Sequence, residues 1–127
     1  NIKNGASWTD EEGREVPNSR LTTPADPPRS YAYCSDTCYL PDLAARVSGV
    51  SCLYHESTYA TPDIEKAQKY FHTTAAQAAQ VARDAQVGRL LLGHYSSKYD
   101  NEDVLLEEAR QVFEASELSN EGMVVTL

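Results

Sequence analysis

The sequence predicts an α/β fold with a largely parallel sheet, and three observations support that prediction. Residues 31–34, 50–54 and 89–92 are short apolar runs of the length that strands have. Segments of helical character separate these runs along the chain. The runs are continuously apolar instead of alternating, which is typical of strands covered on both faces. Strands that alternate with helices pair in parallel, so we expect a sheet with helices packed on it.

Two helices are expected between the apolar runs. Residues 41–47 predict a helix, because Pro41 suits its first turn and Gly49 lies near its end. Residues 74–87 are rich in alanine and glutamine and close at Gly88, which indicates a second and longer helix.

The last part of the chain predicts a third helix and a final strand. Residues 102–113 form an amphipathic pattern, in which the glutamates from Glu102 to Glu108 would form a solvated face. The expected buried face consists of Val104, Leu105, Ala109 and Val112. Residues 123–126 are apolar and β-branched, so we expect them to form the final strand.

Residues 1–29 differ from the rest of the chain. They contain four of the six prolines and the only tryptophan, and their apolar residues have no helical spacing. We expect an irregular leader with one hairpin around Gly13. This leader is interpreted as a segment of the same domain, whose main part is residues 30–127.

Composition limits the classes of function. The formal net charge of −8 excludes a generally basic module that coats nucleic acid. No apolar run approaches the ~20 residues that a membrane span needs, so no membrane partner is expected. The three cysteines are an odd number without a secretory signal, and we interpret them as reduced thiols of a cytoplasmic protein.

Each predicted strand is followed at once by a potential metal ligand or acid–base group. Asp36 follows the first strand, His55 and Glu56 follow the second, and His94 follows the third. Because parallel strands end on one edge of a sheet and lie ~4.8 Å apart, these side chains can converge. Aspartate oxygen and histidine nitrogen are normal ligands of zinc or manganese. The pattern therefore predicts a site at this edge.

Plainer interpretations remain open for these residues. An aspartate after a strand often caps the next helix, and a lone histidine there is more often hydrogen-bonded locally than bound to a metal. Two protein ligands are also too few for catalytic zinc, which typically has three. For His72, spacing alone favours a surface position before a helix capped by Thr73 or Thr74. The alternative is an acid–base group oriented by Glu56.

Four motifs, in order, resemble the ribonuclease Z family. This family comprises the tRNA 3′-processing endonucleases of the metallo-β-lactamase superfamily. The motifs are Tyr-Ala-Tyr-Cys-Ser-Asp-Thr at 31–37, Leu-Tyr-His-Glu-Ser-Thr at 53–58, His-Thr-Thr at 72–74 and Leu-Leu-Leu-Gly-His-Tyr-Ser-Ser-Lys-Tyr at 90–99. The leader also resembles the family through its Lys-Asn-Gly at 3–5 and Glu-Gly-Arg-Glu-Val at 12–16.

The resemblance implies an αββα sandwich with two zinc ions per complete subunit. The family's His-x-His-x-Asp-His ligand motif does not occur in this chain, which has three histidines, none two positions from another. The chain is therefore expected to be the C-terminal half of such a domain. An incomplete domain would hold only part of the zinc ligands and would be inactive alone.

Residue roles follow from the resemblance position by position. Asp36 and His94 are implied to bind metal, and Glu56 and His72 to form the pair that protonates the departing 3′ oxygen. Lys98 and Tyr99 match a basic–aromatic pair that would touch RNA phosphate. Structural motif positions are Thr37, His55, Thr58 and Thr74.

The implied activity is hydrolysis of a phosphodiester bond that releases the 3′ trailer of precursor tRNA, in a cytoplasmic homodimer. One rival is another hydrolase of the superfamily, such as a phosphodiesterase that shares the Asp36 and His94 ligands. The other rival is a non-catalytic module that serves oligomerisation or protein binding, because half a sandwich exposes an apolar sheet face.

Overall fold

A four-stranded parallel sheet forms the centre of the computed structural model of the chain, which describes residues 1–127. The strand order is β3–β4–β5–β6, so consecutive strands are neighbours in the sheet. The strands are β3 (Tyr31–Cys34), β4 (Cys52–Glu56), β5 (Leu90–Gly93) and β6 (Ser116–Leu118). The predicted α/β class and parallel pairing are confirmed.

The register of the sheet brings the strand ends to one level. Cys34 pairs with His55, and His55 pairs with Leu92, so β3, β4 and β5 finish side by side. Glu56, the last residue of β4, lies opposite Gly93, the last residue of β5. Asp36 and His94, which follow β3 and β5, therefore start from the same edge, as the sequence predicts. His55 and Glu56 were expected after the second strand, but they are the last two residues of β4, because the strand runs two residues further than its apolar run.

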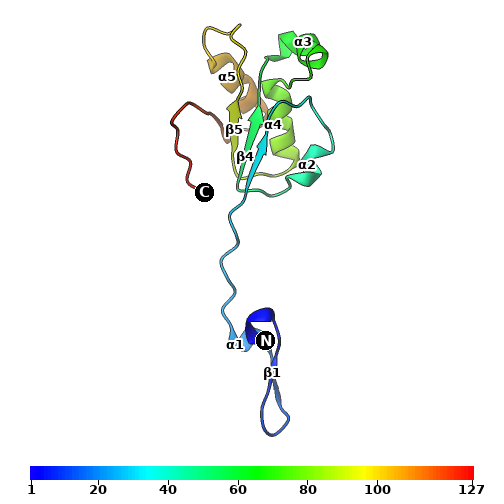
Figure 1. Cartoon of the computed structure of the whole chain (residues 1–127), viewed down its shortest axis with the longest axis vertical. Coiled ribbons are helices and arrows are strands. Elements are labelled where there is room, and N and C mark those ends of the chain that lie inside the picture. The colour runs from blue at the N-terminus through cyan, green and yellow to red at the C-terminus, as the bar shows by residue number, and fades with distance from the viewer.

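Helices cross between the strands. They are α2 (Leu43–Arg46), α3 (Ile64–Lys69), which continues the 3₁₀ turn η2 (Thr61–Asp63), α4 (Ala75–Asp84) and α5 (Asp103–Val112). Figure 1 shows α4 and α5 packed together behind the sheet. Between these two helices and the sheet, the fully buried leucines Leu53, Leu90, Leu92 and Leu105 form the core. The small alanines of α4 allow this helix to approach the strands closely.

The helix predictions are confirmed in part. The expected alanine face of α4 is fully buried, although the helix ends at Asp84 and not at residue 87. On α5, Leu105 and Ala109 are buried as expected, but Val104 is 45% exposed. Val104 precedes Leu105 by one helical step of about 100°, which turns it away from α4. Helix α3 was not expected.

The predicted final strand at residues 123–126 is wrong. The fourth strand of the sheet is β6, which pairs with β5. β6 ends at Leu118, five residues before the predicted strand begins. The apolar tail instead crosses the second sheet face, where Met123, Val125 and Leu127 line a hollow of about 360 Å³ with Tyr31 and Leu91. An apolar, β-branched run suits a strand or a covering segment equally, and the sheet contacts decide between them.

The second face of the sheet is only partly covered. Tyr31 is 49% exposed and Tyr33 is 65% exposed, and Tyr33 stacks on Tyr54 with 4.6 Å between the ring centroids. Helices α4 and α5 pack on the opposite face (Figure 1). One layer of helices on one sheet, with the second face open, is half of an αββα arrangement. The predicted half-sandwich is therefore confirmed.

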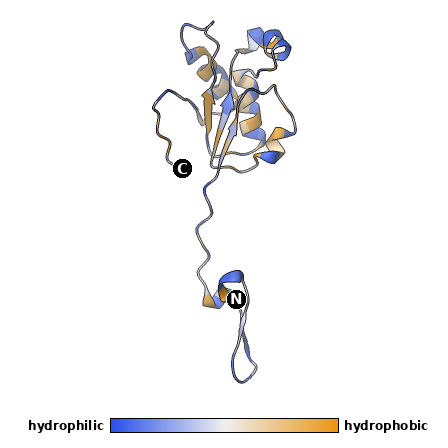
Figure 2. Cartoon of the chain, in the orientation of Figure 1, coloured by the Kyte–Doolittle hydropathy of each residue, from blue (hydrophilic) through white to orange (hydrophobic).

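The N-terminal residues form a separate arm. It consists of η1 (Ile2–Asn4), the paired strands β1 (Trp8–Thr9) and β2 (Glu15–Val16), and α1 (Asn18–Leu21). The predicted hairpin is confirmed, with Gly13 in its turn at φ 81°. An extended segment over residues 23–30 joins the arm to β3 and holds it away from the sheet (Figures 1 and 2). That the arm belongs to the same domain stays a prediction.

None of the helices combines the length and the apolar character that crossing a bilayer requires. The three cysteines are free, with Cys52 buried and Cys34 and Cys38 half-buried.

Candidate active site

Asp36 and His94 leave the sheet in an unusual backbone conformation. Asp36 lies two residues after β3, at φ 49°, and His94 directly follows β5, at φ 58°. Residues other than glycine rarely adopt positive φ, and such strain is concentrated at functional sites.

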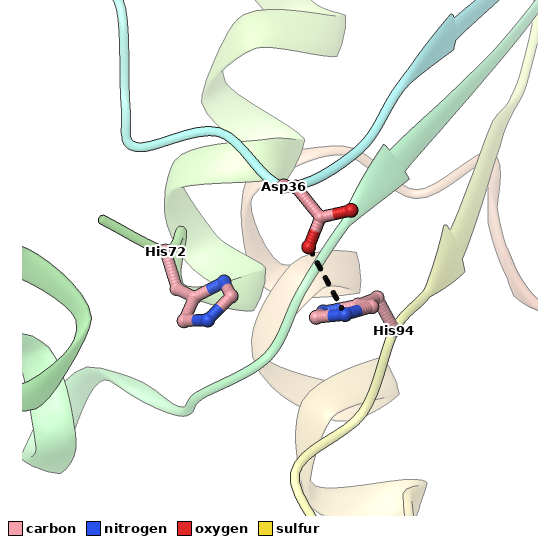
Figure 3. A group of neighbouring side chains, drawn as sticks. All are labelled: Asp36, His72 and His94. Carbon is pink, nitrogen blue, oxygen red and sulfur yellow. Dashed lines mark ion pairs between the residues drawn. The ribbon is translucent and has the colours of Figure 1, made fainter. Parts of the chain in front are cut away.

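The two side chains meet a third one at this edge. Nε2 of His94 lies 3.3 Å from Oδ1 of Asp36. Together with His72, they offer one ligand atom each, and these atoms all lie within 4.8 Å of one another. Figure 3 shows the three side chains pointing toward one another from three separate segments. Asp36 caps no helix, so the helix-cap interpretation is wrong.

His72 owes its orientation to a carboxylate below it. Its Nδ1 lies 3.0 Å from Oε1 of Glu56, and its side chain is 23% exposed. The following helix α4 is capped by Thr74, whose hydroxyl accepts a hydrogen bond from the backbone N–H of Gln77, while the Gln77 side chain accepts one from the Thr74 backbone N–H. The interpretation of His72 as a free surface residue is therefore wrong, whereas Thr74 is the cap that the sequence allows.

Glu56 is fully buried and accepts four hydrogen bonds. Its Oε1 accepts from His72 Nδ1 and from the backbone N–H of Thr37 at 2.8 Å. Its Oε2 accepts from the Thr58 hydroxyl at 2.7 Å and from the backbone N–H of Thr73 at 2.9 Å. Burial alone would raise the pKa of Glu56, but the hydrogen bonds from Thr73, His72, Thr58 and Thr37 outweigh burial and lower the pKa. Glu56 is therefore an ionised carboxylate below the site.

The loop that contains Thr37 and the loop that contains Thr73 both contact the Glu56 carboxylate. The hydroxyl of Thr73 donates to the backbone carbonyl of Thr37 at 2.6 Å, which ties the loop after β3 to the loop before α4. Thr73 was not singled out as a functional position from the sequence. Its partners lie 17 and 36 residues away along the chain, and no local pattern signals them.

The residues present fit a metal ion. A carboxylate oxygen and imidazole nitrogens form the donor set, which is a normal one for zinc. The exposed fraction of the side chains rises from 0% at Glu56 to 76% at Asp36. Imidazole ligands are usually oriented by a hydrogen bond on the ring nitrogen away from the metal. Glu56 makes such a hydrogen bond with Nδ1 of His72. Thr58 makes one with Nδ1 of His94, at 2.9 Å. The ligand atoms thus face outward while their supports are buried.

Lys98 and Tyr99 lie in the loop that follows His94, and both contact Asp63. The Lys98 ammonium lies 2.5 Å from one Asp63 oxygen, and the Tyr99 hydroxyl donates to the same oxygen at 2.8 Å. The Tyr99 hydroxyl also accepts from the Ala60 backbone N–H at 2.7 Å. The Lys98 ammonium and the Tyr99 hydroxyl hold the pKa of Asp63 below its ordinary value. These contacts show a structural role; contact with RNA phosphate stays a prediction.

His55 is fully buried beside the site and points to none of its ligands. Its Nδ1 lies 2.8 Å from the backbone carbonyl of Glu56, and its Nε2 has no hydrogen-bond partner. Burial lowers the pKa of His55 despite that carbonyl. A neutral, packed imidazole agrees with the structural role that the sequence motif implies.

Glu108 departs from the solvated face predicted for α5. Its carboxylate accepts hydrogen bonds from the backbone N–H groups of Thr61, at 2.8 Å, and Ala76, at 3.0 Å. It therefore ties η2 and the first turn of α4 to α5. Sequence reasoning missed this residue because the partners lie 47 and 32 positions away.

Comparison with known proteins gives a consistent family. The model of the beta-lactamase superfamily domain matches residues 6–95. Ribonuclease Z of Bacteroides fragilis is 46% identical over 126 residues, which are 99% of this chain and 41% of that protein. Ribonuclease Z of Porphyromonas gingivalis is 47% identical, again over 99% of this chain and 41% of that protein. The chain thus spans about 41% of the length of these relatives.

Two solved structures are similar in fold. The metallo-beta-lactamase fold protein YhfI from Bacillus subtilis has a TM-score of 0.66 and 23% identity, over 72% of this chain and 37% of that one. The short form of human tRNase Z has a TM-score of 0.55 and 24% identity, over 71% of this chain and 30% of that one. The resemblance to ribonuclease Z predicted from the motifs is confirmed by the curated relatives, and the chain belongs to the beta-lactamase superfamily.

Proposed function

We propose that this chain is part of a ribonuclease Z that removes the 3′ trailer from precursor tRNA by hydrolysing one phosphodiester bond. The observation that carries the proposal is the convergence of Asp36, His72 and His94 at one sheet edge, with the Glu56 carboxylate buried behind His72. The relatives named ribonuclease Z support the same function. The whole reaction needs the part of the relatives that this chain does not span.

The metal ligands of the proposed site are Asp36 and His94, with two zinc ions in the complete subunit. The Asp36 carboxylate and Nε2 of His94 would help to hold the ions at this edge of the sheet. When bound, the ions would supply Lewis-acid stabilisation of the charge that develops on the phosphate. Because catalytic zinc typically takes three protein ligands, the remaining ligands would come from outside this chain.

His72 is the proposed proton donor. Nδ1 of His72 is hydrogen-bonded to Glu56, which leaves Nε2 as the ring nitrogen available to a substrate on a side chain that is 23% exposed. Nε2 would give its proton to the 3′ oxygen of the tRNA body as the bond between phosphorus and that oxygen breaks. The ionised Glu56 carboxylate stabilises the charged imidazole that donates the proton and fixes its ring orientation. A positioned acid of this kind contributes about 10²–10⁴-fold to a reaction rate.

The complete protein is proposed to act in the cytoplasm as a homodimer, and Lys98 and Tyr99 are proposed to lie near the RNA backbone. The Lys98 side chain is 48% exposed, so its ammonium can reach a phosphate while remaining near Asp63. The free cysteines agree with a reducing compartment. Light scattering of the complete protein would test the dimer.

The test compares variants of the complete enzyme that contains this chain. Asp36→Asn and His94→Gln should abolish cleavage of precursor tRNA, and His72→Gln should lower its rate by about 10²–10⁴-fold. Asp42→Asn is the matched control, because Asp42 is exposed and pairs only with Arg46. Unchanged cleavage in the Asp36 and His94 variants would refute the proposal and support a non-catalytic module.

A second assay separates the rival hydrolase. The complete enzyme should cleave precursor tRNA far faster than bis(p-nitrophenyl) phosphate, whereas a general phosphodiesterase would show the reverse preference. The 127-residue chain alone should bind zinc weakly and cleave no precursor tRNA, because it holds too few ligands. Robust cleavage by this chain alone would contradict the proposed division of the site.

A further inference from the structure

The hydroxyl of Thr58 lies between the two halves of the site. Thr58 follows β4 by two residues and is 5% exposed. Its Oγ1 lies 2.7 Å from Oε2 of Glu56 and 2.9 Å from Nδ1 of His94. One side chain thus joins the carboxylate below His72 to the imidazole that faces Asp36.

Proton counting fixes the direction of both hydrogen bonds. The ionised Glu56 carboxylate has no proton to give, and each of its oxygens accepts two hydrogen bonds. The single hydroxyl proton of Thr58 must therefore point to Glu56. The Thr58 oxygen can then only accept a hydrogen bond from His94. Nδ1 of His94 consequently carries a hydrogen, and Nε2, which lies 3.3 Å from Oδ1 of Asp36, is the ring nitrogen left to bind a metal ion.

We propose that Thr58 is a positioning residue that holds His94 in the Nδ1–H tautomer and so keeps its Nε2 available as the ligand atom. This inference rests on the proposed function, because it assigns a use to the free Nε2. The buried Glu56 carboxylate thus orients both imidazoles. It contacts His72 directly, and it acts on His94 through the Thr58 hydroxyl. The two exposed Nε2 atoms then take different roles, one as a ligand and one as a proton carrier.

Two variants separate the hydroxyl from the shape of the side chain. Thr58→Val keeps the branched shape and removes the hydroxyl, whereas Thr58→Ser keeps the hydroxyl. Long-range ¹H–¹⁵N NMR spectra of the imidazoles would be recorded on the 127-residue chain after chelator treatment at pH 8, where unperturbed histidine is neutral. The wild type and Thr58→Ser should show His94 with Nδ1 protonated. Thr58→Val should shift His94 toward the Nε2–H form.

His72 is the internal control in the same spectra. It contacts Glu56 without Thr58, so its tautomer should be the same in all three proteins. A wild-type His94 with Nε2 protonated would overturn the inference even if Thr58→Val failed to fold. An unchanged Nδ1–H form of His94 in folded Thr58→Val would overturn it as well, because the hydroxyl would then not set the tautomer.

Metal affinity of the complete enzyme supplies the second readout. Competition against a chromophoric zinc chelator should show about 10–100-fold weaker binding in Thr58→Val, with recovery in Thr58→Ser. Equal affinity of all three proteins would contradict the role of Thr58. If the tautomers and affinities change as expected but no protein cleaves precursor tRNA, the proposed function fails while the positioning role of Thr58 stands.

Discussion

Oε1 of Glu56 and Nδ1 of His72 lie 3.0 Å apart, although the two residues are separated by 16 positions and belong to different loops. Glu56 is completely buried and His72 is partly exposed, so the pair connects the interior of the fold to the open edge of the sheet. Burial keeps the Glu56 carboxylate away from competing water, and four hydrogen bonds keep it ionised.

Glu56→Gln should destabilise the chain by about 1–3 kcal/mol, because it places an amide NH₂ among hydrogen-bond donors and leaves buried groups unsatisfied. Urea unfolding followed by circular dichroism would measure the change. Glu107→Gln is the matched control, since Glu107 lies exposed on α5. Equal stability of the two variants would show that the hydrogen-bond network around Glu56 contributes little.

Gly93→Ala should destabilise the fold by about 1–3 kcal/mol, a typical cost of overpacking. A Cβ at Gly93 would overlap the Tyr54 phenol, whose nearest ring carbons would lie 2.5 Å away. The Tyr54 ring, which stacks on Tyr33, would have to shift to make room. Unfolding measurements should show a smaller cost for Gly93→Ala in a Tyr54→Ser background; an equal cost there would contradict the proposed clash.

Thr74→Ala should destabilise the chain by about 1 kcal/mol, because Thr74 caps α4 and its hydroxyl accepts the Gln77 backbone N–H. Thr74→Ser should restore most of the stability. Thr126→Ala is the control at an exposed threonine. Thermal unfolding of the four proteins would check this order, and a Thr74→Ala chain as stable as the control would refute the capping contribution.

The ion pair of Asp63 with Lys98 should make stability depend on pH. The pKa of Asp63 in the folded chain lies below its ordinary value of 3.8, chiefly because of the Lys98 ammonium and then the Tyr99 hydroxyl. The stabilisation is therefore fully present above the unfolded pKa and is lost as the pH falls through the lower folded pKa.

Unfolding free energies from pH 6 downward would test this dependence. The unfolding free energy of the wild type should exceed that of Asp63→Asn most at pH 6, and this difference should shrink below about pH 4. Lys98→Met should reduce the pH-dependent part of the difference, since it removes the ammonium that lowers the pKa of Asp63 most. A difference that stays constant from pH 6 to pH 2 would contradict the assignment.

Much of the fold follows from local pattern. The apolar runs give β3, β4 and β5, and the alanine spacing gives α4, because these segments bury their apolar side chains whichever neighbour covers them. The tail at residues 123–126 shows the limit. Its residues suit a strand, but β6 occupies the edge beside β5, and the tail lies near Tyr31 and Leu91 on part of the second face of the sheet.

The sequence by itself determined that Asp36 and His94 follow parallel strands. Because parallel strands end at the same edge of a sheet, this placement predicts that the two side chains lie close together. Only the tertiary structure decided that His72 joins them, that Glu56 lies buried beneath, and that Thr58 bridges to His94. These contacts join loops 16 to 36 residues apart, and a hydrogen bond depends on how loops pack and exclude water, which spacing along the chain does not encode.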